Sequence, residues 1–148
     1  MRTVADMLAN KTKPNNIIAP NAMVVEALHL MKQVNLSYVI VMDGDVLKGI
    51  FSERNYSRNV ALEGKSSATC PVKEAMTKAL VKISPEHTVE ECIQLILDNK
   101  CRYLPVEENG QLLGVITIHD ILREALRSKE ALFDSSLTDR LIEEGSVY

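Results

Sequence analysis

Tryptophan is absent from this chain of 148 residues, and aromatic residues of all kinds make up only 4%. Proteins that bind single-stranded nucleic acid stack the bases on exposed aromatic rings, so this composition argues against that function. The net charge is only −3, from 17 basic and 20 acidic residues. So small a charge provides no overall electrostatic attraction to DNA or to an anionic membrane. We therefore expect neither nucleic acid nor a membrane as a partner.

Cysteines and long hydrophobic runs are also scarce. The cysteines Cys70, Cys92 and Cys101 are odd in number and form no CxxC pair, which indicates a reducing compartment without a disulfide framework. No apolar run approaches the roughly 18 residues of a membrane span. Residues 1–6 lack the basic-then-apolar pattern of a secretory signal. We expect a cytoplasmic protein. The three histidines show no metal-ligand spacing with cysteines or carboxylates, so no metal site is expected.

The chain has the composition of an ordinary globular protein. Hydrophobic residues make up 46% and charged residues 25%, which argues against extensive disorder. A chain near this length buries roughly 70% of the surface that it exposes when unfolded. A sizeable hydrophobic core is therefore expected.

An internal repeat is the most informative feature. Shifted by 65 positions, residues 18–60 align without a gap on residues 83–125, and ten of the 43 pairs are identical. The identical pairs are Ile18/Ile83, Pro20/Pro85, Val24/Val89, Glu26/Glu91, Leu30/Leu95, Tyr38/Tyr103, Val41/Val106, Leu47/Leu112, Gly49/Gly114 and Arg58/Arg123. A shared helical period would not also align proline, glycine and arginine, so the match indicates a duplicated structural unit. A shorter match, residues 4–8 against 72–76, has an offset of 68.

Each copy predicts the same order of elements, β-α-β-β-α. A short apolar strand is followed by an amphipathic helix, two strands joined by a hairpin turn, and a second helix capped by a hydroxyl side chain. In the first copy we expect strands at 17–18, 38–42 and 46–51, a helix over 24–34, the turn at Asp43-Gly44 and a second helix from Ser52. In the second copy we expect strands at 80–83, 103–106 and 111–116, a helix over 89–97, the turn at Asn109-Gly110 and a second helix from Thr117.

The fold class is therefore α/β (α+β), built from tandem β-α-β-β-α repeats. We assign residues 1–65 to the first repeat, 66–127 to the second, and 128–148 to a polar tail with a short helix expected around 137–144. One copy has too few elements to close a core alone. Two copies packed face to face about a pseudo-two-fold axis would close it, and they would leave two equivalent clefts.

Three motifs in combination resemble the CBS domain pair, which is also called a Bateman module. The abbreviation CBS stands for cystathionine β-synthase. One motif is the apolar strand before Pro20 and Pro85, and another is Lys-Cys-Arg-Tyr-Leu-Pro-Val at residues 100–106. The third is Gly-x-x-Thr-x-x-Asp at 114–120, with Gly-x-x-Ser-x-x-Asn at 49–55 in the first copy. The resemblance covers residues 4–127 and extends to a subgroup of small stand-alone pairs.

The resemblance implies a regulatory protein that binds adenosine nucleotides and transmits a signal. Ligands of the family include AMP, ADP, ATP, NAD(H) and S-adenosylmethionine, and its usual assembly is a homodimer. No catalytic cofactor is implied. We expect no effector domain fused to the module, so that a regulated partner, where there is one, would be another chain.

The resemblance also implies roles for particular residues. Thr117 and its counterpart Ser52 would hold phosphate at a helix N-terminus, and Asp120 would accept hydrogen bonds from the ribose hydroxyls. The phosphate-directed group comprises His119, Arg54, Arg58 and Lys65, and Arg102 would reach the partner cleft. The adenine would contact Tyr38, Tyr103, Ile18, Val39, Ile83 and Pro105.

Asn55 departs from the family pattern, which has Asp at this position. An amide hydrogen bond lacks the charge assistance that roughly doubles the strength of a carboxylate bond. We expect the first site to be weaker or altered in specificity. Its additional cations would suit a longer polyphosphate or a dinucleotide.

Simpler interpretations exist for the same residues. Thr117 and Asp120 have the spacing of a helix-capping pair, and Arg54 and Arg58 have that of one solvated helix face. Thr117, His119 and Asp120 lie too close within one helical turn to form a nucleophile–base relay, so we do not expect an enzyme. The alternative function is a protein-interaction scaffold of the same fold that binds no ligand.

Overall fold

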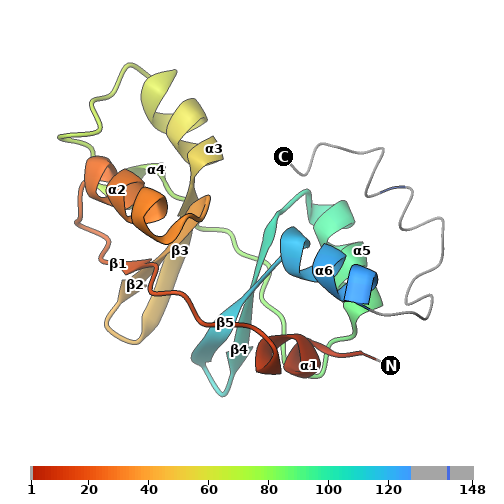
Figure 1. The fold of residues 1–148 in the computed structure, drawn as a ribbon. Helices are drawn as coiled ribbons and strands as arrows, with labels where there is room; N and C mark the ends of the chain where they lie inside the picture. Colours follow the sequence, from red (N-terminus) through yellow and green to blue (C-terminus); the bar gives the residue numbers. More distant parts are fainter. Residues whose placement is uncertain (1, 128–139, 141–148) are drawn as a thin grey trace. The chain divides into compact units, whose positions relative to one another are not determined.

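The computed structural model describes residues 2–127 and Arg140. The tail helix expected around residues 137–144 therefore lies, apart from Arg140, outside the described residues. The chain forms a mixed α/β fold of short helices and two small sheets, which confirms the predicted class (Figure 1). None of the described helices is long and apolar enough to cross a membrane.

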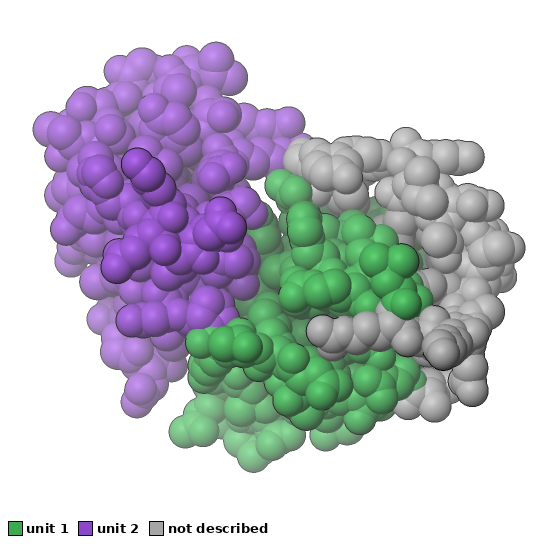
Figure 2. All heavy atoms as spheres, in the orientation of Figure 1, with its two compact units in different colours: residues 1–13, 81–148 green, residues 14–80 purple. Residues whose placement is uncertain are grey.

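Two compact units make up the protein (Figure 2). Each unit has its own cluster of buried hydrophobic residues. Unit 2 is the continuous segment 14–80, whereas unit 1 combines residues 1–13 with residues 81–148. These units differ from the division at residue 65 that follows the sequence repeat. Residues 1–13, assigned above to the first repeat, pack with the second, and residues 66–80, assigned to the second, pack with the first.

Unit 2 contains a three-stranded sheet in the order β1-β2-β3. Its strands are β1 (Ile17–Ile18), β2 (Tyr38–Asp43) and β3 (Val46–Ser52). Its helices are α2 (Val24–Val34), α3 (Glu53–Asn55), the π-helical turn η1 (Tyr56–Ala61) and α4 (Val72–Ala75). β1 pairs with β2 in parallel, and β2 with β3 in antiparallel. Apolar residues from α2, the sheet, η1 and α4 fill the core.

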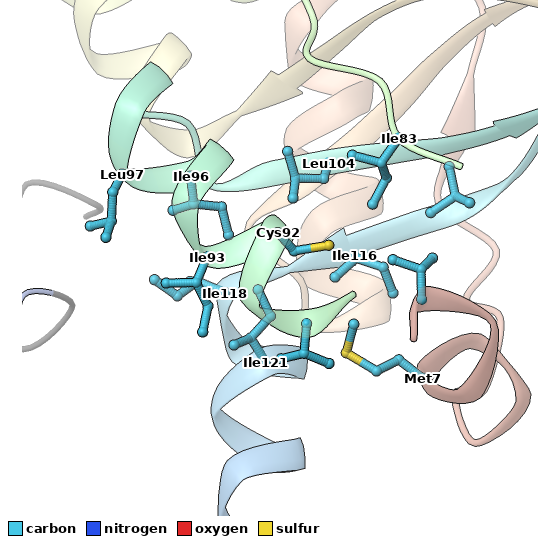
Figure 3. Close-up of a cluster of buried hydrophobic side chains, with 13 residues drawn as sticks. Met7, Ile83, Cys92, Ile93, Ile96, Leu97, Leu104, Ile116, Ile118 and Ile121 are labelled. Atoms are coloured by element: carbon cyan, nitrogen blue, oxygen red, sulfur yellow. The ribbon is translucent and has the colours of Figure 1, made fainter. Parts of the chain in front are cut away.

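Unit 1 contains the hairpin β4 (Tyr103–Glu108) and β5 (Gln111–Thr117). Its helices are α5 (Val89–Asn99), α6 (Ile118–Arg127) and α1 (Val4–Ala9). The core joins both chain segments, because Met7 of α1 lies beside Ile116 and Ile121 of the second repeat (Figure 3). Backbone hydrogen bonds from Val4 to His87 and from Ala5 to Pro85 add to this attachment.

The strand expected at residues 80–83 is reduced to one bridge, between Ile83 and Val106. In unit 2, the amide of Ile40 donates to the carbonyl of Asn16 at 2.8 Å and so extends β1. The equivalent of Ile40 is Pro105, which has no N–H to donate. The parallel ladder therefore lacks this bond in unit 1, and the prediction of a strand there was wrong.

The two hairpins keep the same register, with Tyr38 opposite Ser52 and Tyr103 opposite Thr117. The second turn is Asn109-Gly110, as expected, and both residues have positive φ, as a type I′ turn requires. The first turn falls at residues 44–45, one position later than predicted. Only its glycine, Gly44, has positive φ.

Candidate functional site

The two repeated motifs form the same capping box at the start of a helix. Thr117 caps α6: its amide donates to Asp120 Oδ2 at 2.8 Å, and the amide of Asp120 donates to Thr117 Oγ1 at 3.2 Å. Ser52 and Asn55 make the same pair of bonds before α3, at 2.9 and 3.2 Å. These bonds satisfy backbone groups that a helix N-terminus leaves free. The capping interpretation is therefore correct for both motifs, whatever else they bind.

Asp120 has further partners that the sequence did not indicate. Lys11 donates from Nζ to Asp120 Oδ2 at 2.7 Å and to the carbonyl of Val115 at 2.6 Å. Arg123 Nη2 donates to Asp120 Oδ1 at 3.1 Å. The side chains of Lys11 and Asp120 are 17% and 7% exposed, whereas that of Arg123 is 59% exposed. Oδ2 thus accepts from Thr117 and Lys11 in a buried setting, whereas the partner of Oδ1 among the described residues is the exposed Arg123.

A second ion pair holds the same chain segment one turn along α6. Arg2 Nε donates to Glu124, whose side chain is 5% exposed. This hydrogen bond raises the pKa of the Arg2 guanidinium. Beside the two ion pairs lies a cavity of about 30 Å³, which is room for water but far below the volume of a nucleoside pocket. Its lining consists of Met7, Asn10, Lys11, Asp120, Arg123 and Glu124.

Unit 2 makes a neutral version of the same arrangement. Asn55 donates from Nδ2 to Thr77 Oγ1 at 3.1 Å, while its Oδ1 accepts from the amide and hydroxyl of Ser52. Thr77 follows α4 as Lys11 follows α1. The charged pair of one unit is therefore matched by an uncharged pair in the other.

The remaining predicted site residues fall into accessible and buried sets. Tyr38 and Tyr103 lie next to the motifs, because they pair across the hairpins with Ser52 and Thr117. The Arg102 guanidinium lies 6.0 Å from the centre of the Tyr103 ring. The exposed residues are His119, Arg58 and Lys65, and the partly exposed ones are Ile18, Arg54, Arg102 and Tyr103. The buried ones are Tyr38, Val39, Ile83 and Pro105, of which Val39 and Ile83 belong to the two cores.

Two polar residues that were not predicted from the sequence, Lys11 and Asn16, lie beside predicted site residues. Lys11 lies outside the repeated segment, so no repeated counterpart drew attention to it. Asn16 is fully buried, donates from Nδ2 to the carbonyl of Tyr38 at 3.3 Å, and has no partner for Oδ1 among the described residues. The equivalent position holds Val81, so a polar residue in an apolar stretch was a usable signal.

The motif glycines allow a neighbouring segment to approach the sheet closely. A Cβ atom at Gly49 would lie 2.6 Å from the carbonyl oxygen of Thr77, and one at Gly114 would lie 3.0 Å from Leu8 Cδ2. The segment that approaches Gly49 carries Thr77, the partner of Asn55. The segment that approaches Gly114 carries Lys11, the partner of Asp120. No group of three or more metal-ligating side chains occurs in the described part of the chain.

The repeated motif, its register and its closely packed glycine coincide with a known family model. The model of the CBS domain matches residues 4–61 and again residues 72–127. The chain belongs to the CBS-domain family. This result confirms the resemblance and the two repeats, which lie end to end along most of the sequence.

Small CBS-domain proteins are among the relatives. The CBS domain-containing protein YhcV of Bacillus subtilis is 30% identical over 122 residues, which cover 82% of this chain and 85% of YhcV. Among solved structures, a protein with CBS domains from Burkholderia ambifaria has a TM-score of 0.81 and 32% identity, covering 86% of this chain and 96% of that one. The structure of CBSX2 in complex with AMP has a TM-score of 0.70 and 26% identity, covering 88% and 100%.

Proposed function

We propose that this CBS-domain protein is a non-catalytic regulatory module that binds an adenosine nucleotide. The observation that carries the proposal is the pair of capping motifs, Ser52 with Asn55 and Thr117 with Asp120, each of which places a polar side chain at the start of a helix. Support also comes from CBSX2, a structural neighbour that is described in complex with AMP.

The ligand is an adenosine nucleotide of the AMP, ATP, NAD(H) or S-adenosylmethionine type. Asp120 contacts the ribose, and Thr117 with the N-terminus of α6 contacts phosphate. Asn55 offers mainly an N–H donor, because its oxygen is used by Ser52, so the first site favours a ligand that is held through phosphate by Arg54, Arg58 and Lys65. The protein acts in the cytoplasm as a homodimer and signals to a separate protein.

The test is a thermal-shift and calorimetric panel of AMP, ADP, ATP, NAD(H) and S-adenosylmethionine on the wild type, Asp120→Ala and Asn55→Ala. A ligand at 100 times its dissociation constant adds about 2.7 kcal/mol of stability. We expect at least one ligand to stabilise the wild type, and one of the two substitutions to reduce that effect at least tenfold in affinity. Absence of heat and of thermal shift for every ligand contradicts the proposal.

A scaffold that binds no ligand is the second candidate. The observation that favours it is the saturation of Asp120 Oδ2 by Thr117 and Lys11. A scaffold shows no nucleotide binding in the panel, yet it retains a specific protein partner in a pull-down. Release of phosphate from ATP by the pure protein would instead indicate an enzyme.

A further inference from the structure

Lys11 occupies the oxygen that a bound ribose would need. Oδ2 of Asp120 accepts the amide and hydroxyl of Thr117 as well as the Lys11 ammonium, so its acceptor capacity is used within the protein. A ribose 2′,3′-diol donates two hydrogen bonds and is best met by both carboxylate oxygens. Arg123 on Oδ1 is exposed and easily displaced, but Lys11 is largely buried and is also bound to Val115.

Lys11 lies between α1 and the start of unit 2, so its contact with Asp120 holds the segment that leads from one unit to the other. Residues 2–8 remain held to unit 1 by the core contacts of Val4 and Met7 and by backbone bonds to residues 85 and 87. Among the described residues, the hydrogen bonds of Lys11 to unit 1 outside its own segment are those of its ammonium. Residues 10–13 then lead directly to unit 2, which begins at Pro14.

The other repeat is built differently at this point. Thr77 contacts Asn55, but it is also held to unit 2 by two backbone hydrogen bonds with Ile50, at 2.9 and 3.1 Å. If Thr77 loses its contact with Asn55, its backbone hydrogen bonds with Ile50 still hold it to unit 2. Residues 10–13 are held instead through the Lys11 side chain, whose ammonium binds Asp120 and the carbonyl of Val115.

We propose that Lys11 competes with the ligand's ribose for Asp120, so that it sets the ribose affinity of the second-repeat site and couples occupancy to the segment joining the units. A nucleoside that engages both oxygens of Asp120 displaces the Lys11 ammonium and frees residues 10–13 from unit 1. This inference rests on the proposed function, because it requires a ribose-bearing ligand at Asp120.

The experiment compares Lys11→Met, which keeps the apolar stem and removes the ammonium, with the wild type and the matched control Lys13→Met. Lys13 is exposed on the same segment. Affinities are measured for adenosine, which has the diol and no phosphate, and for 2′,3′-dideoxyadenosine, which lacks the diol. Removing one charge-assisted competitor shifts an equilibrium by about tenfold.

We expect Lys11→Met to bind adenosine about tenfold more tightly, with no gain for the dideoxy compound, for Lys13→Met or in an Asp120→Ala background. In the wild type, adenosine should also speed amide exchange at residues 10–13. Weaker or unchanged adenosine binding by a folded Lys11→Met protein overturns the competition while the proposed function stands. Loss of AMP affinity with unchanged adenosine affinity also overturns it, since Lys11 would then contact phosphate. If no variant binds any nucleotide or nucleoside, both proposals fall.

Discussion

Asp120 and Asn55 occupy equivalent positions and serve the same capping role, but their other partners differ in charge. Asp120 is bound by Lys11 and Arg123, and Asn55 by the neutral Thr77. A buried carboxylate without a cation would be costly, because burial removes the solvation of the charged form. The substitution of Asn for Asp is thus accompanied by a neutral residue on the connecting segment, and each pair remains satisfied.

Cys92 provides a prediction at the scale of a single residue. Burial in the core of unit 1 raises the pKa of its thiol to about 12. The reactive thiolate is therefore rare at pH 8, and we expect iodoacetamide to leave Cys92 unmodified in the native protein and to alkylate it after unfolding in urea. Peptide mass spectrometry measures both states.

Cys101 is the internal comparison for that labelling. Burial also raises the pKa of its thiol, but the residue is only half-buried, so it should react slowly and before Cys92. Rapid modification of Cys92 in the folded protein would show that the core of unit 1 is open on the timescale of labelling.

At the scale of elements, the repeated glycines determine how closely neighbouring segments approach the sheets. Gly49 of β3 faces the end of α4 and the residues after it, and Gly114 of β5 faces α1. A Cβ atom at Gly49 meets a backbone oxygen, which cannot move without displacing the segment. A Cβ atom at Gly114 meets the end of a flexible leucine side chain. The same motif position therefore tolerates added volume differently in the two repeats.

We expect Gly49→Ala to lower the free energy of unfolding by about 2 kcal/mol or more, because overpacking against fixed atoms typically costs about 1–3 kcal/mol. Gly114→Ala should cost less, since Leu8 can change rotamer. Urea denaturation of the two variants measures the difference. Equal losses, or a larger loss for Gly114→Ala, would contradict this account of the motif.

At the scale of the whole molecule, the two units exchange segments relative to the sequence repeats. α1 precedes the aligned segment 18–60 but completes the core of unit 1, while α4 precedes the aligned segment 83–125 but completes the core of unit 2. The short sequence match has an offset of 68 instead of 65 because the loop after α1 is three residues longer than the loop after α4. The helices α1 and α4 are equivalent parts of the two units. In the chain, α1 comes before the aligned segment of its unit, residues 83–125, whereas α4 comes after that of its unit, residues 18–60.

Val4 and Val72 are equivalent, fully buried residues of α1 and α4, and they test this exchange. Val4→Ala should weaken amide protection in β4 and β5, and Val72→Ala in β2 and β3. Each truncation removes buried methyl groups at a cost of roughly 2 kcal/mol. Hydrogen exchange followed by peptide mass spectrometry assigns the loss to a unit. The reverse pattern would mean that the units follow the division at residue 65.

Much of the local structure could be predicted from the sequence. The duplication, the helix starts at Ser52 and Thr117, the Asn109-Gly110 turn and the mixed α/β class depend on residue spacing, proline, glycine and capping side chains, all of which act over a few positions. The reduced strand near Ile83 also has a local cause, the missing N–H of Pro105. The prediction of a full strand followed the apolar pattern of residues 80–83 and did not take this proline into account. The pseudo-two-fold packing of the repeats and the ligand roles of the site residues stay predictions.

Only the tertiary structure decided which segments complete each unit and which partners the motif side chains have. The spacing of Thr117 and Asp120 predicted their capping pair, but nothing in it indicated that Lys11, more than a hundred positions away, would bind the same carboxylate. Periodicity describes what a residue does with its near neighbours. The path of the chain determines which distant charges meet, and burial makes such a meeting necessary, because an enclosed carboxylate must find a cation or hydrogen-bond donors.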